Sequence, residues 1–386
     1  MNGSSRNDSV CGLIFGKVMI WMEKEQFTPL NWSELACDTL MKKYRAEELP
    51  PAGHFHYHQG VFLLGMQRCW EQNHKEKYFH YSKAWIDSLI KPDGTISNFN
   101  PGQLDDIQPG ILLYRLFDQT GERRYQKALH TLISIYKAFP RNSLGGLWHK
   151  RQLPNQMWLD GLFMGGPLAA EYAAKFNCPE LFDMVVLQAE LMAEHCQDPR
   201  TGLLRHGWDE SRKAEWADPK TGCAPECWGR AVGWYVAAVM DILDYLPKNH
   251  QGYYKLTKIF KKLIRAILRY QDESDGRWYQ VVDKGNLPGN WLENSCSCLF
   301  VYAISKAVRK GLLDKSFLEN ARKGYKGVLR SLNFDENGGV KIGNVCIGTG
   351  IGDYDYYIRR PTSVNDLHGV GTFLMMCDEM NRIEKG

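Results

Sequence analysis

The sequence has no excess of charge of one sign and no cysteine pattern typical of a metal site. Its 48 basic and 44 acidic residues give a formal net charge of +4 over 386 residues, which is too balanced for the basic face that nucleic-acid binding requires. The 11 cysteines include no CxxC pair, and an odd number of scattered thiols indicates reduced cysteines. We therefore expect a cytoplasmic protein with no nucleic-acid partner.

The sequence also has no apolar run long enough to span a membrane. The apolar segment at residues 10–22 is too short; it is interrupted by Lys17, lacks a small-residue cleavage site and leads directly into Glu23. We interpret residues 1–25 as a poorly ordered extension, in which Met22 is an alternative start. No membrane partner is expected.

No linker rich in proline, serine or glycine divides the rest of the chain, although 386 residues would by default suggest two domains. Apolar residues are spread evenly from Trp32 to Met380. The lysine-rich segment 255–269 carries apolar residues at helical spacing, so we interpret it as the solvated face of an amphipathic helix. Residues 26–386 are therefore predicted to form one domain, of a size typical of barrels built from repeated units.

A weak internal repeat indicates the architecture. Glycine-centred turns followed by apolar residues recur at Gly94, Gly146, Gly202, Gly276 and Gly338, so that neighbouring turns are 52, 56, 74 and 62 residues apart. Repeats of this length, each with two helical patterns, are typical of helical hairpins arranged around an axis.

The segments between these turns have apolar residues at i, i+3 and i+4, which predicts helices. The predicted helices are 60–71, 110–117, 125–139, 166–174, 181–195, 229–246, 256–270, 291–309, 317–332 and 370–382. With an opening hairpin over 32–71, about six hairpins fit. The sequence therefore predicts an all-α (α/α)6 barrel of six helical hairpins, with a cavity at the rim where the inner helices begin.

Aromatic and polar residues gather at those predicted helix starts. The clusters are 54–60, 148–152, 156–161, 206–210, 228–234 and 278–280. Aromatic rings pack against the C–H faces of sugars, while His, Asp, Arg and Gln satisfy hydroxyl and carboxylate groups. Neither a P-loop nor a dinucleotide fingerprint is present. A short carbohydrate is the substrate class that this composition favours, with no cofactor.

Asp160 is the strongest catalytic candidate. It lies in the apolar stretch MWLDGLFMGGP, where it is either a helix N-cap or a desolvated carboxylate whose pKa is raised. Asp105 and Asp106 open another predicted inner helix, so either could supply the second carboxylate that glycosidases commonly use.

Several stretches resemble the unsaturated rhamnogalacturonyl hydrolases, glycoside hydrolase family 105. They are 55–61 (FHYHQGV), 104–110 (LDDIQPG), 156–167 (QMWLDGLFMGGP), 225–235 (PECWGRAVGWY), 278–285 and 365–369. The resemblance extends in order from about Trp32 to the C-terminus. It implies an (α/α)6 barrel that removes a C4=C5 unsaturated galacturonyl residue from pectin-derived fragments by hydrating the enol ether.

The resemblance also implies residue roles. Asp160 protonates C4 and then activates the water that adds at C5; Asp105 is the second carboxylate, and His206 lies near the water or C4. The expected substrate-binding residues are Tyr57, His58, His149, Lys150, Arg151, Gln152, Trp158, Arg230 and Trp234. Arg230 would hold a polar or anionic sugar group and Trp234 would be a stacking platform, since they lie one helical turn apart. The glycine-rich rim at 348–354 receives no role.

Alternatives remain open at this point. An unsaturated glucuronyl hydrolase acting on glycosaminoglycan fragments would use the same barrel, an inverting glycosidase would use Asp105 and Asp160 as acid and base, and a sugar-binding protein would release nothing. No metal is expected: the alternating His54, His56 and His58 are interpreted as core and sugar-facing histidines. We expect a small oligosaccharide as the partner, and a monomer or a weak homo-oligomer.

Overall fold

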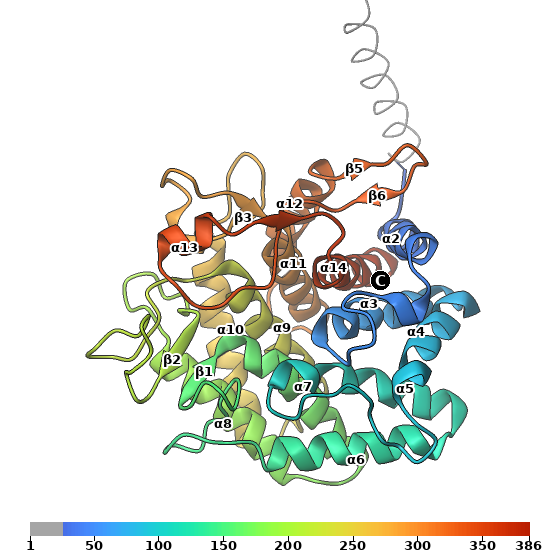
Figure 1. The fold of residues 1–386 in the computed structure, drawn as a ribbon. Helices are drawn as coiled ribbons and strands as arrows, with labels where there is room; N and C mark the ends of the chain where they lie inside the picture. Colours follow the sequence, from blue (N-terminus) through green and yellow to red (C-terminus); the bar gives the residue numbers. More distant parts are fainter. Residues whose placement is uncertain (1–25) are drawn as a thin grey trace, which may run out of the picture.

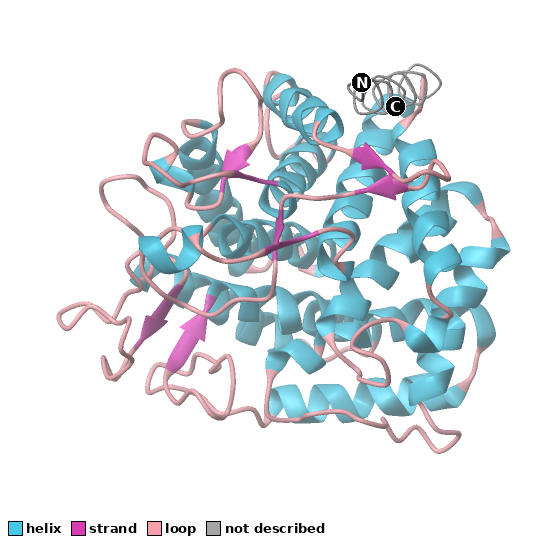
Figure 2. Ribbon diagram, turned by 45° about the horizontal axis from the view of Figure 1, so that its top comes forward, coloured by secondary structure: helices cyan, strands magenta, loops and turns pink. Residues whose placement is uncertain are grey.

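The computed structural model describes residues 26–386, so the extension expected at residues 1–25 lies outside the described residues. Helices succeed one another around a common axis, and the colours of Figure 1 run once round the molecule from blue to red. Short strands and loops gather at one end, as Figure 2 shows. Within residues 26–386, no helix combines the length and the apolar character needed to cross a membrane.

Alternate helices form an inner ring. Its members are α3 (Tyr57–Asn73), α5 (Ile111–Thr120), α7 (Leu159–Lys175), α9 (Gly229–Tyr245), α11 (Asn294–Arg309) and α14 (Leu367–Lys385). Each packs against the next, except that α5 and α7 pack through the short helix η3 (Gln108–Gly110), and α14 closes the ring against α3. This closure needs glycine: a Cβ on Gly371 of α14 would lie 2.5 Å from the backbone of Val61 in α3.

The intervening helices form the outer layer. They are α2 (Pro29–Lys43), α4 (Glu76–Leu89), α6 (Arg123–Lys137), α8 (Glu180–His195), α10 (Gln251–Leu268) and α12 (Phe317–Arg330). The lysine-rich α10 buries Leu256, Phe260 and Leu263 and exposes its charged face, as an amphipathic outer helix should. The predicted (α/α)6 barrel is confirmed. Helix α4, whose buried aromatic residues have helical spacing, is an addition to the helices predicted from the sequence.

The glycine turns follow the outer helices and lead to the next inner helix. Gly94, Gly202, Gly276 and Gly338 all have positive φ, between 74° and 92°, whereas in the second turn this conformation belongs to Gly145 and not to Gly146. Left-handed backbone of this kind favours glycine because it has no Cβ. The last turn closes the hairpin of β5 (Asn333–Phe334) and β6 (Val340–Lys341).

Three further two-stranded antiparallel pairs lie at the ends where the inner helices begin. They are β1 (Gln156–Trp158) with β2 (Gly207–Asp209), β3 (Trp278–Tyr279) with β4 (Leu292–Glu293), and β7 (Val345–Cys346) with β8 (Thr362–Ser363). The loop between β7 and β8 contains the short helix α13 (Tyr354–Ile358). Of these pairs, β1 with β2 joins two loops that are distant in sequence.

Candidate active site

The pairing of β1 with β2 brings Asp160 and His206 together. Trp158 is opposite Gly207 in the register, and the Leu159 amide donates a hydrogen bond to the His206 carbonyl oxygen (3.0 Å). Asp160 follows β1 in the first turn of α7, and His206 directly precedes β2. Two residues that are far apart in sequence are therefore held in place by backbone hydrogen bonds.

His206 links Asp160 to a tyrosine. Its Nε2 lies 3.0 Å from Asp160 Oδ2, and its Nδ1 lies 2.7 Å from the Tyr357 hydroxyl. The His206 side chain is fully buried, whereas Asp160 is 9 % exposed. With the Tyr357 hydroxyl donating to Nδ1, His206 presents an N–H to the carboxylate. The three groups form a continuous hydrogen-bonded chain that ends at Asp160.

The charge state of Asp160 differs from the one predicted. Burial raises the pKa of its carboxyl, but His206 lowers it through charge and a hydrogen bond, and His149 lowers it further, so that the pKa lies below its ordinary value. The expected raised pKa is therefore wrong for the free protein. The N-cap alternative is also wrong, because the N-cap residue of α7 is Trp158 and makes no side-chain capping bond.

A second carboxylate, Asp105, is positioned by another backbone contact. A bridge between Gln103 and Lys150 places Asp105 next to the 149–150 segment. Asp105 lies 2.9 Å from Lys150 Nζ and 3.5 Å from His149 Nε2. Burial raises the pKa of Asp105, but His149 and Lys150 outweigh it, so this pKa also lies below its ordinary value. Asp105 is thus held as a carboxylate.

Asp106 has a different role from Asp105. Its carboxylate accepts hydrogen bonds from the Asn100 amide (2.9 Å) and from Gln103 Nε2 (2.7 Å). Burial raises the pKa of Asp106 to about 6. Of the two carboxylates left open by the sequence, Asp105 lines the cavity described next and Asp106 stabilises the preceding loop.

A cavity of about 360 Å³ opens at this rim. Its volume lies within the range usual for small-molecule sites. It is lined by His56, Tyr57, His58, Asp105, His149, Lys150, Trp158, Asp160, Met164, Gly348, Thr349, Gly350 and Arg360. The structure therefore brings together most of the site residues expected from the sequence. The His149 ring stacks on Trp158 with centroids 4.5 Å apart, which gives the cavity one aromatic wall.

Arg151 and Gln152 do not line this cavity. Both side chains are exposed, and the Arg151 guanidinium lies over the Phe139 ring, 5.3 Å from its centroid. The backbone of Arg151 donates to the Gly102 carbonyl oxygen. The expectation that these two residues bind substrate is not supported by their positions, because the chain turns outward after Lys150.

Arg230 and Trp234 are also placed differently from the prediction. The buried Arg230 guanidinium donates to the carbonyl oxygens of Cys346 (2.5 Å) and Ile347 (2.7 Å) and lies 3.7 Å from Glu293. These hydrogen bonds fix the backbone of Cys346 and Ile347 at the rim. Trp234 is 1 % exposed and packs against Phe163, with centroids 4.3 Å apart. Trp234 therefore offers no face to a sugar in this structure.

Some residues at the site had no role in the sequence prediction. Tyr357 and Trp228 enclose His206, and Arg360 lines the cavity. Asp366 and His368 lie close to His58. The sequence motif 365–369 resembles the family pattern and could have indicated Asp366 and His368 as site residues. Tyr357 lies 151 residues from His206, and the intervening sequence gives no sign of their contact.

Comparison with known proteins gives consistent matches. Residues 32–384 match the family model described as Glycosyl Hydrolase Family 88. The structure resembles a glycoside hydrolase from family 105 of C. acetobutylicum, with a TM-score of 0.86 and 35 % identity, covering 91 % of this chain and 99 % of that one. The chain is 24 % identical to the unsaturated rhamnogalacturonyl hydrolase YesR of Bacillus subtilis, covering 76 % of this chain and 79 % of YesR. An unsaturated glucuronyl hydrolase of Bacillus sp. GL1 shares the fold, with a TM-score of 0.65 and 16 % identity, over 86 % of this chain and 88 % of that one.

Proposed function

The chain belongs to the glycoside hydrolases of families 88 and 105, and we propose that it removes the terminal C4=C5 unsaturated galacturonyl residue from short rhamnogalacturonan fragments. The observation that carries this proposal is that Asp160, which lines a cavity of suitable size for a short sugar, is paired with the buried His206. A single carboxyl group that is oriented by a histidine can both give and take a proton.

The reaction is hydration of an enol ether. The carboxyl of Asp160 gives its proton to C4, which leaves an oxocarbenium ion at C5. Water adds at C5 and transfers a proton to the Asp160 carboxylate, so the enzyme returns to its starting state. The resulting hemiketal opens, and the hemiacetal left at C1 releases rhamnose or a rhamnosyl chain. The net change is the addition of one water molecule.

The low pKa of Asp160 in the free protein is compatible with this role. A substrate uronate brings a second negative charge into the buried site, and a like charge nearby raises the pKa of a carboxyl group. Substrate binding would therefore favour the protonated form of Asp160 that the first step requires. His206 would hold the carboxylate in the second step.

Two cationic groups in the cavity support an anionic sugar. Lys150 lines the cavity and is partly exposed. Arg360 donates through one nitrogen to the Gly348 carbonyl oxygen (2.5 Å), while its buried Nε has no hydrogen-bond partner among residues 26–386. An unpaired buried donor is costly, and a uronate carboxylate would satisfy it.

The choice of rhamnogalacturonan follows from the motifs and from the likeness to YesR, whose name states that activity. The likeness to the glucuronyl hydrolase, at 16 % identity, concerns the fold alone. We also propose a cytoplasmic location: all ten cysteines in residues 26–386 are free, as is usual in a reducing compartment. The substrate would then be an oligosaccharide small enough to be imported.

The proposal is tested by mixing the purified protein with the unsaturated galacturonyl–rhamnose disaccharide and following the ultraviolet absorbance of the conjugated double bond. We expect the absorbance to fall as free rhamnose appears. Rhamnose released without a fall in absorbance would contradict hydration and indicate ordinary glycoside hydrolysis. If only unsaturated glucuronyl disaccharides react, the substrate class proposed here is wrong.

Replacing His206 tests whether this residue lowers the pKa of Asp160. In His206→Gln the electrostatic effect and the hydrogen bond by which the imidazole lowers the pKa of Asp160 are weakened, so this pKa rises. Because the first step needs protonated Asp160, the alkaline fall of kcat/KM should move upward by about one pH unit, even though the maximal rate decreases. The measurement is the pH profile of kcat/KM for both proteins. His130→Gln, outside the site, is the control, and an unshifted profile in His206→Gln would contradict the assigned coupling.

A further inference from the structure

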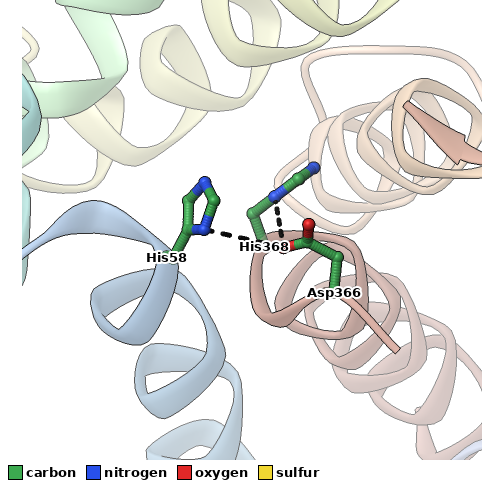
Figure 3. Close-up of side chains that lie close together, drawn as sticks. All are labelled: His58, Asp366 and His368. Carbon is green, nitrogen blue, oxygen red and sulfur yellow. Dashed lines mark ion pairs between the residues drawn. The ribbon is translucent and has the colours of Figure 1, made fainter. Parts of the chain in front are cut away.

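His58, Asp366 and His368 form a compact cluster between the first turn of α3 and the start of α14, as Figure 3 shows. His58 Nδ1 lies 3.7 Å from Asp366 Oδ1, and His368 Nδ1 lies 2.8 Å from the same oxygen. One potential ligand atom from each residue lies within 4.8 Å of the other two. His58 also lines the substrate cavity.

The hydrogen bond of His368 determines where its proton lies. Its Nε2 is 3.1 Å from the backbone carbonyl oxygen of Cys346. A carbonyl oxygen only accepts, so Nε2 carries the hydrogen, and the Nδ1 of a neutral ring therefore carries a lone pair. That Nδ1 is fully buried and makes no hydrogen bond of acceptable geometry with any described residue, although a carboxylate oxygen lies 2.8 Å away. A lone pair and a carboxylate oxygen repel each other, so either a proton or a metal ion must lie between Nδ1 and Asp366.

His58 is oriented in the same manner. Its Nε2 contacts the Tyr57 hydroxyl at 2.8 Å, which leaves Nδ1 facing Asp366. Metal-ligating histidines commonly use the far ring nitrogen for a hydrogen bond to a carbonyl or another polar group, which fixes the ring and its tautomer. Both histidines of the cluster show this arrangement. The positive charge of nearby Arg230 is balanced by Glu293 at 3.7 Å.

We propose that His58, Asp366 and His368 bind a divalent transition-metal ion of the zinc type beside the substrate cavity. Two imidazole nitrogens and one carboxylate oxygen are a donor set that suits zinc, and three protein ligands leave a fourth position open. Tetrahedral zinc, with bonds of about 2.0–2.1 Å, needs ligand atoms about 3.3 Å apart. In the cluster, Asp366 Oδ1 lies 2.8 Å from His368 Nδ1 and 3.7 Å from His58 Nδ1, and the three ligand atoms lie within 4.8 Å of one another, so metal binding would bring the more distant atoms closer together.

The sequence did not predict this metal site. The alternation of His54, His56 and His58 suggested neighbours along the chain, but the His56 ring instead accepts from the His58 amide as the N-cap of α3. The partners of His58 come from α14, which packs directly against α3. Closure of the barrel therefore creates the cluster.

Cobalt titration of the full chain tests the proposal without any variant. After treatment with a chelator and its removal, addition of Co²⁺ should produce the visible absorption bands of a tetrahedral site, saturating at one equivalent, and Zn²⁺ should abolish them. Elemental analysis of protein purified without a chelator should then find close to one zinc per chain. If no bands appear and no metal is retained, the cluster is a His368 imidazolium–Asp366 ion pair and the proposal is wrong.

Substitutions of the proposed ligand residues test which side chains bind the metal. His368→Gln and Asp366→Asn should weaken Co²⁺ binding at least about 100-fold, since each loses a direct ligand, a larger loss than the 10–100-fold typical of outer-shell changes. His250→Gln is the matched control, because His250 lies 3.2 Å from Asp183 in a similar pair at the surface. Circular dichroism confirms that each variant is folded. Equal binding by His368→Gln and the parent protein would show an adventitious metal only and would overturn the assignment.

Discussion

Asp160→Asn is expected to lower kcat for the unsaturated disaccharide by about 10³- to 10⁴-fold, with little change in KM. An asparagine has nearly the same shape and can still accept a hydrogen bond from His206, so binding is retained. It can neither give a proton to C4 nor take one from water, and general acid–base groups typically contribute 10²- to 10⁴-fold. The measurement is the initial rate of ultraviolet bleaching, compared with the parent protein under identical conditions.

The control for this prediction is Asp183→Asn. Asp183 lies in the first turn of α8 with its side chain 75 % exposed, so the same chemical change there should leave the rate unaltered. Thermal unfolding should show that both variants are folded. An Asp160→Asn protein with most of its activity would mean that another group transfers the proton.

Asp241→Ala is expected to cost about 3–5 kcal/mol of unfolding free energy, because it removes the buried carboxylate that pairs with both Arg68 and Lys306. Asp241 is 5 % exposed; it accepts hydrogen bonds from the Tyr302 hydroxyl and Lys306 Nζ, and lies 3.3 Å from Arg68. In this variant Asp244, 2.6 Å from Lys306, is the remaining acidic neighbour of the buried ammonium. Urea unfolding at neutral pH measures the effect.

An exposed ion pair provides the comparison for Asp241. Asp355 and Arg359 lie 2.8 Å apart with their side chains 60 % and 76 % exposed. Removing Asp355 should change the unfolding free energy by less than about 1 kcal/mol, because solvent screens exposed pairs. Equal effects at the two positions would contradict the view that burial determines the importance of the Asp241 network. This network borders a second cavity of about 220 Å³, whose charged lining residues belong to the far halves of the inner helices.

The barrel could be predicted from the sequence because its signals are local. A glycine turn depends on the φ angle of a single residue. The i, i+3, i+4 spacing of apolar residues can be recognised within one helix, without knowledge of its neighbours. Helix α4 was missed although its spacing is regular, since its sequence mixes aromatic and charged residues. The sequence placed the second turn at Gly146, whereas the residue with positive φ is Gly145. Two neighbouring glycines cannot be distinguished without the backbone dihedral angles.

The site was less predictable because its geometry depends on distant contacts. Burial raises the pKa of Asp160, but His206, which β1–β2 pairing brings close, lowers it. The spacing of Arg230 and Trp234 correctly places both on one face of α9, but a residue one turn further along the helix lies deeper in the barrel and is covered by Phe163. Whether a side chain reaches the cavity therefore depends on packing between helices.

Proton NMR of the reaction in D₂O tests the central claim most directly. Hydration with Asp160 as the acid predicts that the vinylic C4 proton signal disappears at the rate at which free rhamnose appears. Spectra from the first minutes, before the protons beside the new ketone exchange, should show one deuteron at C4. Free rhamnose together with an intact vinylic signal would contradict the account, because it would show cleavage at the anomeric carbon.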